Sequence, residues 1–355
     1  MKKTLLLLLT LSLHSLNAQV YDTLVWADEF NGTGGLDTSK WWHQTLLPNA
    51  GQSWWNGEIQ HYTNRDTNSY QQNGALYLTA LKESFTDQNV TKDYTSARLN
   101  SKFAFTYGRV EVRAQLPTGV GTWPAIWLLG QNITEVGAYW YTQGYGTTGW
   151  PACGEIDIME HWGHNQDHVS SAMHTPSSFG GTVNVGSQYV PGVSNSMHVY
   201  ALEWTPTKMV FTVDSVEHYT YEPSVRDMNT WPFDDPQYLL FNIAIQSTID
   251  SNFTSSPMIV DYVRVYQSSQ LSTEELKEAL VEVLPNPASN YVEIVQPYEH
   301  ATAQFTDLLG KVVLTQDALD IRTKIDVSSL APGSYIARIT DAQSGASVQR
   351  TVVVQ

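Results

Sequence analysis

Short runs in which apolar and polar residues alternate cover most of the chain from Tyr21 to about Gln267. Typical runs are Gly74–Ala80, Gly108–Ala114 and Met209–Val213, and they are separated by turn-forming Gly, Pro, Asn and Asp residues. Side chains of a β-strand point to alternate faces, so this period of two indicates strands with one buried face. Many short strands at close spacing predict an all-β sandwich or barrel, and roughly 250 residues suit one jelly-roll-sized domain.

A change in composition near residue 270 divides the chain. Helical periodicity is clearest at Ser272–Leu280, which begins with a Ser-x-x-Glu capping pattern inside a segment, residues 269–280, that we interpret as a linker. Residues 281–355 contain no Trp and return to short strands after the Pro285-Asn286-Pro287 turn. We therefore predict a large β-domain at residues 19–268 and a small immunoglobulin-like β-sandwich at residues 281–355.

The first 18 residues have the pattern of a secretory signal peptide. Lys2 and Lys3 precede an apolar run from Leu5 to Leu13, and small residues lead to Ala18. The run is shorter than the roughly 20 residues that cross a bilayer, and no other segment is long enough. We predict cleavage after Ala18, no membrane span, and a secreted or cell-surface protein.

The charge balance narrows the choice of partners. With 19 Lys and Arg against 35 Asp and Glu, the formal net charge is −16, which disfavours nucleic acid and anionic lipid and suits a neutral partner or a cation. The chain also carries 12 Trp and 19 Tyr, whose flat faces and polar edges suit stacking on sugar rings or filling an interface.

Three carboxylates stand in an otherwise apolar strand at residues 154–160 (GEIDIME). In a regular strand Glu155 and Asp157 share one face, whereas Glu160 falls on the other face beside Ile156, where burial of its charge would be costly. A one-residue bulge near Met159 would return Glu160 to the first face, and bulges are common beside active sites. Repulsion among carboxyls in such a row should raise the pKa of at least one of them. The row would then hold a proton donor beside an ionised partner, as glycoside hydrolysis requires. The alternatives are a solvated sheet face and a cation site.

This segment and its surroundings resemble glycoside hydrolase family 16, in its laminarinase branch. The resemblance implies a β-jelly-roll with a concave cleft, no catalytic cofactor, and a retaining endo-glucanase acting on β-1,3-glucan or mixed-linkage β-1,3-1,4-glucan. Glu155 would be the nucleophile and Glu160 the general acid/base, with Asp157 modulating the pair. The other matching segments, in family order, are residues 26–32 (WADEFNG), 55–63 (WNGEIQHYT), 96–102 (SARLNSK), 121–128 (GTWPAIWL), 172–175 (AMHT) and 261–266 (DYVRVY).

The same resemblance suggests residues that contact the sugar, although each has a structural alternative. Trp123 and Trp127 would stack on glucose or pack in the core, and Arg98 would bind hydroxyls or form a salt bridge. Asn56 would bind hydroxyls, and His174 matches a histidine near the acid/base but could be a satisfied interior group. A structural calcium ion is also expected, because the family holds one at positions that match Glu29, Gly74 and Asp261, with Gly74 contributing its carbonyl.

The small C-terminal region resembles the sorting domain of the type IX secretion system. The resemblance rests on residues 285–294 (PNPASNYVEI), Asp307–Lys311 and residues 330–339 (LAPGSYIARI). It implies the type IX secretion machinery as a partner and an export step across an outer membrane. Two other functions stay open for the whole chain, a non-catalytic β-glucan-recognition protein and a hydrolase of agar-type galactans in the same family.

Overall fold

The computed structural model describes residues 21–268, 281–298, 300–342 and 347–355. The signal peptide expected at residues 1–18, the linker at 269–280 and the helix expected at Ser272–Leu280 lie outside the described residues. Within the described ranges, no helix has the length and apolar character needed to cross a membrane.

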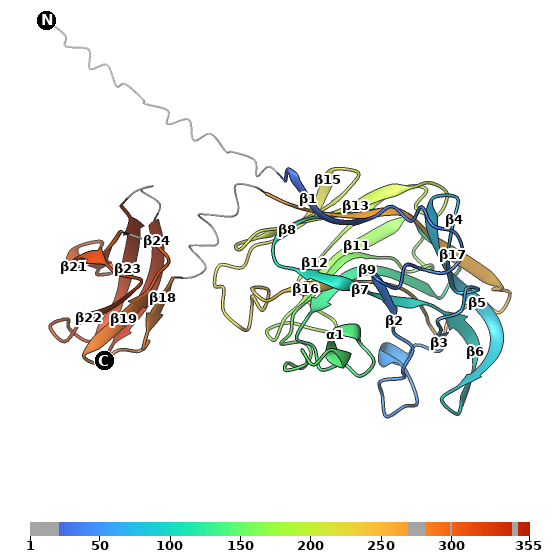
Figure 1. The fold of residues 1–355 in the computed structure, drawn as a ribbon, viewed down its shortest axis with the longest axis horizontal. Helices are drawn as coiled ribbons and strands as arrows, with labels where there is room; N and C mark the ends of the chain where they lie inside the picture. The colour runs from blue at the N-terminus through green and yellow to red at the C-terminus, as the bar shows by residue number, and fades with distance from the viewer. Residues whose placement is uncertain (1–20, 269–280, 299, 343–346) are drawn as a thin grey trace, which may run out of the picture.

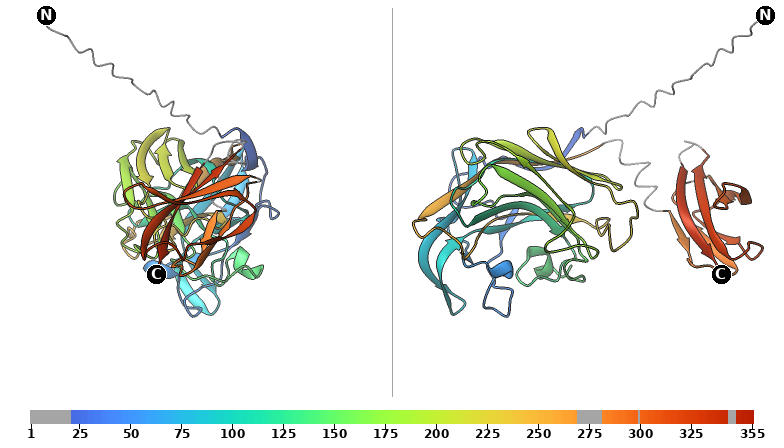
Figure 2. Two further views of the ribbon diagram at one scale, coloured as in Figure 1. Left: turned by 90° about the vertical axis from the view of Figure 1, so that its left-hand side faces the viewer. Right: turned by 180° about the vertical axis from the view of Figure 1, so that it is seen from behind.

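Residues 21–268, the larger region, form two mostly antiparallel sheets that face each other as curved layers (Figures 1 and 2). Ten strands make the first sheet, in the order β15-β14-β13-β8-β17-β5-β6-β3, with β1 paired to β17 and β4 to β5. Their bounds are β1 Thr23–Asp28, β3 His61–Tyr62, β4 Ser69–Gln72, β5 Ala75–Asp87, β6 Val90–Ser96, β8 Gly108–Gln115, β13 His198–Trp204, β14 Met209–Val213, β15 Val216–Tyr221 and β17 Ser255–Gln267.

Seven strands make the second sheet, in the order β12-β11-β10-β9-β16-β7-β2. Their bounds are β2 Trp41–His43, β7 Arg98–Phe105, β9 Thr122–Gly130, β10 Glu155–Glu160, β11 His168–His174, β12 Val185–Tyr189 and β16 Gln237–Ile245. The described helices of this region are short: a 3₁₀ turn η1 at Trp55–Gly57 and α1 at Tyr139–Thr142. The carboxylate strand β10 therefore lies inside the sheet, between β9 and β11.

The hydrophobic core lies between the two sheets and explains the sequence pattern. In β8 of the ten-stranded sheet, Val110 and Val112 are fully buried and alternate with polar residues on the outer face, the period of two expected for a strand with one buried face. Strand β16 is buried on both faces, and its sequence is accordingly a nearly continuous apolar run. The all-β sandwich predicted for this region is confirmed.

The C-terminal residues form a separate set of strands with their own core. One sheet has the order β18-β19-β22 and the other β21-β20-β23-β24. Buried side chains of this core include Phe305, Tyr298 and Ile339, so the region has the two-sheet make-up of the small β-sandwich predicted from its sequence. The bounds are β18 Glu282–Leu284, β19 Tyr291–Val295, β20 Ala301–Thr306, β21 Val312–Leu319, β22 Arg322–Asp326, β23 Gly333–Asp341 and β24 Ser347–Val354.

Candidate active site

Strand β10 contains the bulge that the sequence predicted. Against β9, Asp157 pairs with Trp127 and Met159 pairs with Ile126, so Ile158 is the extra residue. Ile158 and Met159 both enter the core between the sheets, at 1% and 0% exposure. The extra residue returns the following side chain to the opposite face, which places Glu155, Asp157 and Glu160 together in a row.

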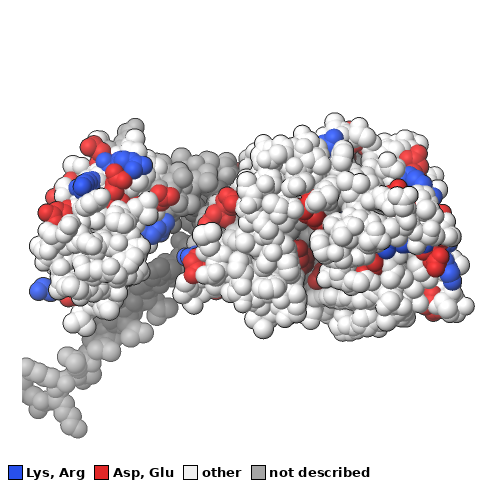
Figure 3. Space-filling view, turned by 90° about the horizontal axis from the view of Figure 1, so that it is seen from below, with Lys and Arg blue, Asp and Glu red and all other residues white. Residues whose placement is uncertain are grey.

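The carboxylate row lies in a cleft of about 610 Å³ on the outer face of the seven-stranded sheet. Figure 3 shows a groove across the larger region with acidic atoms along it. Four of the five predicted sugar-binding residues also line this cleft, and the fifth, His174, lies beside the carboxylates on the neighbouring strand. The four are Asn56, Arg98, Trp123 and Trp127.

A tryptophan donates a hydrogen bond to each outer member of the row. The indole Nε1–H of Trp150 donates to Glu155 Oε2 at 3.0 Å, and the indole of Trp123 donates to Glu160 Oε1 at 2.9 Å. Trp123 is half-buried and stacks on Trp162 with 5.8 Å between ring centroids. Trp123 therefore presents a supported aromatic surface beside Glu160, as expected of a sugar-stacking residue.

Burial dominates the electrostatics of the three carboxyls. It raises the pKa of Glu155, Asp157 and Glu160 to about 8 each, because the ionised form loses its hydration. The charge of Asp157 contributes to this rise for both glutamates, whereas the Trp123 hydrogen bond acts against it for Glu160. At least one member of the row therefore keeps its proton at neutral pH, which supplies a proton donor beside an ionised group.

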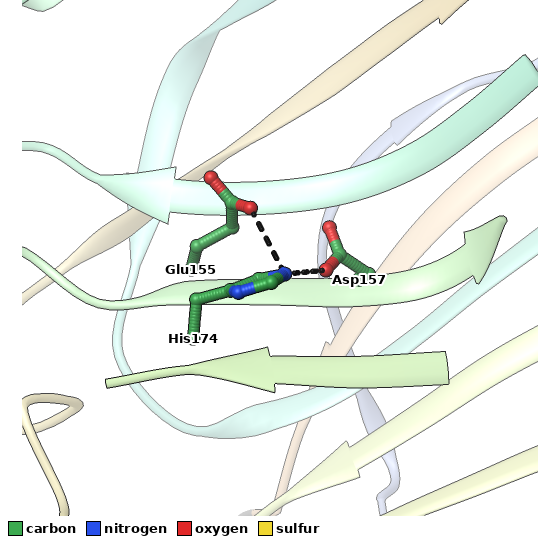
Figure 4. A group of neighbouring side chains, drawn as sticks. All are labelled: Glu155, Asp157 and His174. Carbon is green, nitrogen blue, oxygen red and sulfur yellow. Dashed lines mark ion pairs between the residues drawn. The ribbon is translucent and has the colours of Figure 1, made fainter. Parts of the chain in front are cut away.

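His174 is the cross-strand partner of Glu155 and lies against two of the carboxyls (Figure 4). Its Nε2 is 3.1 Å from Asp157 Oδ2 and 3.5 Å from Glu155 Oε1. The backbone N–H of Gly180 donates to His174 Nδ1 at 3.1 Å, so Nδ1 carries a lone pair and the proton sits on Nε2.

This tautomer bears on whether Glu155, Asp157 and His174 form a metal site. The side chains of Glu155, Asp157 and His174 place one ligand atom each within 4.8 Å of the others, as in a metal site. A metal-bound imidazole must offer a lone pair, yet the nitrogen that faces the carboxyls bears hydrogen. The arrangement fits a neutral imidazole lying against the carboxyl row better than a cation site.

Arg98 and Trp127 are held by other protein groups as well as lining the cleft. Arg98 is 5% exposed, pairs with Glu135 at 3.0 Å and donates to Gln44 at 3.0 Å. Its guanidinium lies over the Trp127 ring, 4.8 Å from the ring centroid. The salt-bridge alternative for Arg98 is thus present in the structure, and only part of its surface faces a ligand.

Glu58 and Trp150 line the cleft but were not among the predicted site residues. Glu58 is buried, which raises its pKa, and its Oε2 accepts from Tyr62 at 2.8 Å. Tyr62 in turn accepts from Asn242 at 3.2 Å, and Asn242 accepts from the Trp127 indole at 2.7 Å. A chain of hydrogen bonds therefore ties Glu58 to the aromatic floor. The signal for Glu58 was a carboxylate among aromatic residues within residues 54–62 (WWNGEIQHY).

The three positions expected to hold calcium lie on or next to paired strands of the ten-stranded sheet. Strand β17 carries Asp261 and pairs with both β1 and β5. The ladder with β1 ends at Asp28, next to Glu29, and the ladder with β5 ends at Leu76, two residues after Gly74. The backbone thus permits a shared ligand set of two carboxylates and one carbonyl.

In this structure both carboxylates pair with arginines. Arg264 makes two 2.8 Å hydrogen bonds to Glu29, and Arg113 lies 2.5 Å from Asp261. A cation bound here would have to share these oxygens or displace the guanidinium groups. The donor types fit calcium, and the ion itself stays a prediction.

Comparison with known proteins agrees with this geometry. Residues 56–264 match the sequence profile of the glycosyl hydrolases family 16, and residues 282–355 match that of a secretion system C-terminal sorting domain. The chain belongs to family 16 of the glycosyl hydrolases and carries a sorting domain for secretion or attachment at the cell surface.

Two characterised relatives share the larger region. A beta-glucanase from Rhodothermus marinus is 40% identical over 261 residues, which cover 69% of this chain and 85% of the relative. A glucan endo-1,3-beta-glucosidase A1 from Niallia circulans is 38% identical and matches 69% of this chain, which spans only 38% of that longer protein.

A solved structure shares the fold as well. LamA from Zobellia galactanivorans, crystallised as a variant with laminaritriose and laminaritetraose, is 46% identical and superposes with a TM-score of 0.65. The match covers 70% of this chain and all of that chain. The predicted β-jelly-roll and glycoside hydrolase class are confirmed, and the recognition-protein and galactan-hydrolase alternatives are not favoured.

Proposed function

We propose that this protein is a secreted retaining endo-glucanase that hydrolyses β-1,3-glucan of the laminarin type or mixed-linkage β-1,3-1,4-glucan. The observation that carries the proposal is the row of Glu155, Asp157 and Glu160 in an aromatic cleft, held in place by the β10 bulge. Relatives that act on such glucans share the whole larger region, which supports the choice of substrate.

Glu155 is assigned as the nucleophile. Its Oε2 accepts from the Trp150 indole and its Oε1 lies 3.5 Å from His174 Nε2, and both contacts act against the rise in pKa that burial causes. One carboxylate oxygen attacks the anomeric carbon while the glycosidic C–O bond breaks. The product of this step is a glycosyl ester on Glu155 and a leaving chain.

Glu160 is assigned as the acid and then the base. Buried beside the charge of Asp157, it holds a proton that it gives to the departing oxygen. Once Glu155 is esterified, one negative charge has left the row, so the pKa of Glu160 falls and the carboxylate can take a proton from water. That water attacks the same carbon, releases the sugar with retained configuration and restores both side chains.

Reducing-sugar release tests the proposal. The wild type should act on laminarin and on mixed-linkage β-glucan but not on agarose, and Glu155→Gln should abolish release. Proton NMR of the first products should show the β-anomer, since two displacements retain configuration. Release from agarose alone, or α-anomer as the first product, would refute the substrate or the mechanism respectively.

We also propose that the sorting domain uses the type IX secretion machinery and that the signal peptide supplies the first export step. The match over residues 282–355 supports this route. Residues 281–355 fused to a periplasmic reporter should carry it to the surface of a bacterium that has this machinery. Retention of the fusion in the periplasm would contradict the proposal.

A further inference from the structure

The bulge in β10 is matched on its other side by a single residue of β11. In that ladder Asp157 pairs with Ala172 and Glu160 pairs with Ser170, so Ile158 and Met159 together face Ser171. A bulge removes regular ladder partners from the backbone, and a buried carbonyl without a partner is costly. The hydroxyl of Ser171 fills this role, because its Oγ donates to the Ile158 carbonyl at 2.8 Å.

A histidine from the opposite sheet holds this serine. His218 Nε2, on β15, lies 2.8 Å from Ser171 Oγ. The serine proton is already used on the Ile158 carbonyl, so the imidazole must be the donor. Among the described residues His218 Nδ1 has no hydrogen-bond partner, as expected when the proton is on Nε2. Burial lowers the pKa of His218 to about 4, which keeps the ring neutral at working pH.

The resulting chain of hydrogen bonds runs from the ten-stranded sheet through the core to the catalytic strand. Ser171 is fully buried and neither Ser171 nor His218 lines the cleft, so neither touches substrate. We propose that Ser171 and His218 are positioning residues, which fix the bulge at Ile158 and thereby hold Glu160 in the carboxylate row. The inference rests on the role proposed for Glu160 as acid/base.

The reason is the period of two in a strand. If the extra residue vanished, the side chain of Glu160 would turn toward the core, because every side chain beyond the lost residue changes face. The hydrogen bond from Ser171 selects one carbonyl and so one position of the bulge. Glu155 precedes the bulge and should keep its place, so damage should fall on proton transfer more than on nucleophilic attack.

This difference can be measured with two substrates. Cleavage of laminarin needs protonation of the leaving oxygen, whereas an aryl β-laminaribioside with a nitrophenol leaving group needs little. Ser171→Ala should lower kcat on laminarin about 10- to 100-fold, the size expected for a misplaced catalytic group, with KM nearly unchanged. With the aryl substrate, the rate constant of the glycosylation step should change less than threefold. The initial burst of nitrophenol measures this rate constant.

Two further variants and one control separate positioning from loss of stability. His218→Leu should resemble Ser171→Ala, and His218→Gln should recover most of the activity, because the Gln amide retains an N–H donor at similar reach. The control is Ser96→Ala, since Ser96 is also fully buried and its Oγ has no hydrogen-bond partner among the described residues. It should leave both activities intact.

Equal losses on both substrates, or a lowered melting temperature with full kcat, would overturn the inference. If Ser171→Ala does not fold, the two His218 variants give the same test. A wild type inactive on every glucan would instead refute the proposed function. A crystal structure of a folded Ser171 or His218 variant then decides, and an unchanged bulge at Ile158 with Glu160 in place would reject the positioning role.

Discussion

Acidic side chains on the two sheets of the larger region have opposite surroundings. On the outer face of the ten-stranded sheet, each of four carboxylates meets an arginine, and hydrogen bonding lowers the pKa of Glu29. Each of these acids thus lies against a positive charge. The pairs are Arg264 with Glu29 at 2.8 Å, Arg113 with Asp261 at 2.5 Å, and Arg109 with Glu111 at 2.8 Å and Glu203 at 2.6 Å.

In the cleft of the seven-stranded sheet, the carboxyl row has no ion pair with Lys or Arg among the described residues. Its hydrogen-bond donors are the indoles of Trp123 and Trp150, and His174 Nε2 lies 3.1 Å from Asp157 Oδ2. Arg98, which lines the same cleft, is paired with Glu135 instead. Neutral donors orient carboxyls without cancelling their charge, so the same residue types become surface ion pairs on one sheet and proton carriers on the other.

Among substitutions that test this difference between the two sheets, the largest expected effect is the loss of catalysis when a cleft carboxyl is replaced. Glu155→Gln keeps the size and the acceptor oxygen for Trp150 but removes the nucleophile. Activity on laminarin should fall by about 10⁴-fold or more, since losing a nucleophile removes the covalent pathway. Glu111→Gln on the outer sheet is the matched control and should keep wild-type kcat. Substantial turnover by Glu155→Gln would assign the nucleophile elsewhere.

The same substitution should make the folded protein more stable at neutral pH. Burial raises the pKa of Glu155 from an ordinary 4.5 to about 8, so between these pH values the folded state binds more protons than the unfolded state. Stability from this group is therefore present below pH 4.5 and is lost as pH rises toward 8. Glu155→Gln should gain about 1–3 kcal/mol at pH 7 and nothing near pH 4.

Urea unfolding at several pH values measures this gain. Glu29→Gln on the outer sheet provides the opposite sign, because its carboxylate has a lowered pKa and contributes stability above pH 4.5 that is lost on acidification. Glu29 is 41% exposed on its side chain, so its effect should stay below about 1 kcal/mol. Destabilisation by both substitutions at pH 7 would contradict the contrast between the sheets.

The contrast also shows which parts of the site a sequence reveals. The carboxylate row and its bulge were predictable, because acids in an apolar strand conflict with the period of two unless one residue is extra. Trp150 and Glu58 lie outside regular alternation, in a turn and a loop respectively, and reach the cleft only through long-range packing. The contact of Ser171 with His218 joins strands of different sheets across 47 residues of sequence, and no local pattern encodes it.

Trp150 offers a smaller test of how neutral donors act in the cleft. Trp150→Phe keeps an aromatic surface but removes the hydrogen bond to Glu155, which should raise the pKa of that carboxyl further. We expect kcat/KM to fall about tenfold, the size of one hydrogen bond to a charged group. In a plot of kcat/KM against pH, the acidic limb should move to higher pH. A fall in kcat/KM with an unmoved limb would mean that Trp150 serves only as a sugar platform.

The smallest expected effect concerns calcium on the outer sheet. If an ion binds at Glu29, Gly74 and Asp261, adding a chelator should lower the melting temperature of the wild type by a few degrees, because a ligand of the folded state stabilises it. Glu29→Gln should remove that response, whereas Glu203→Gln, which breaks an ion pair on β13, a strand that does not pair with β1, β5 or β17, should keep it. A wild type indifferent to both chelator and added calcium would show that the arginines alone satisfy these carboxylates.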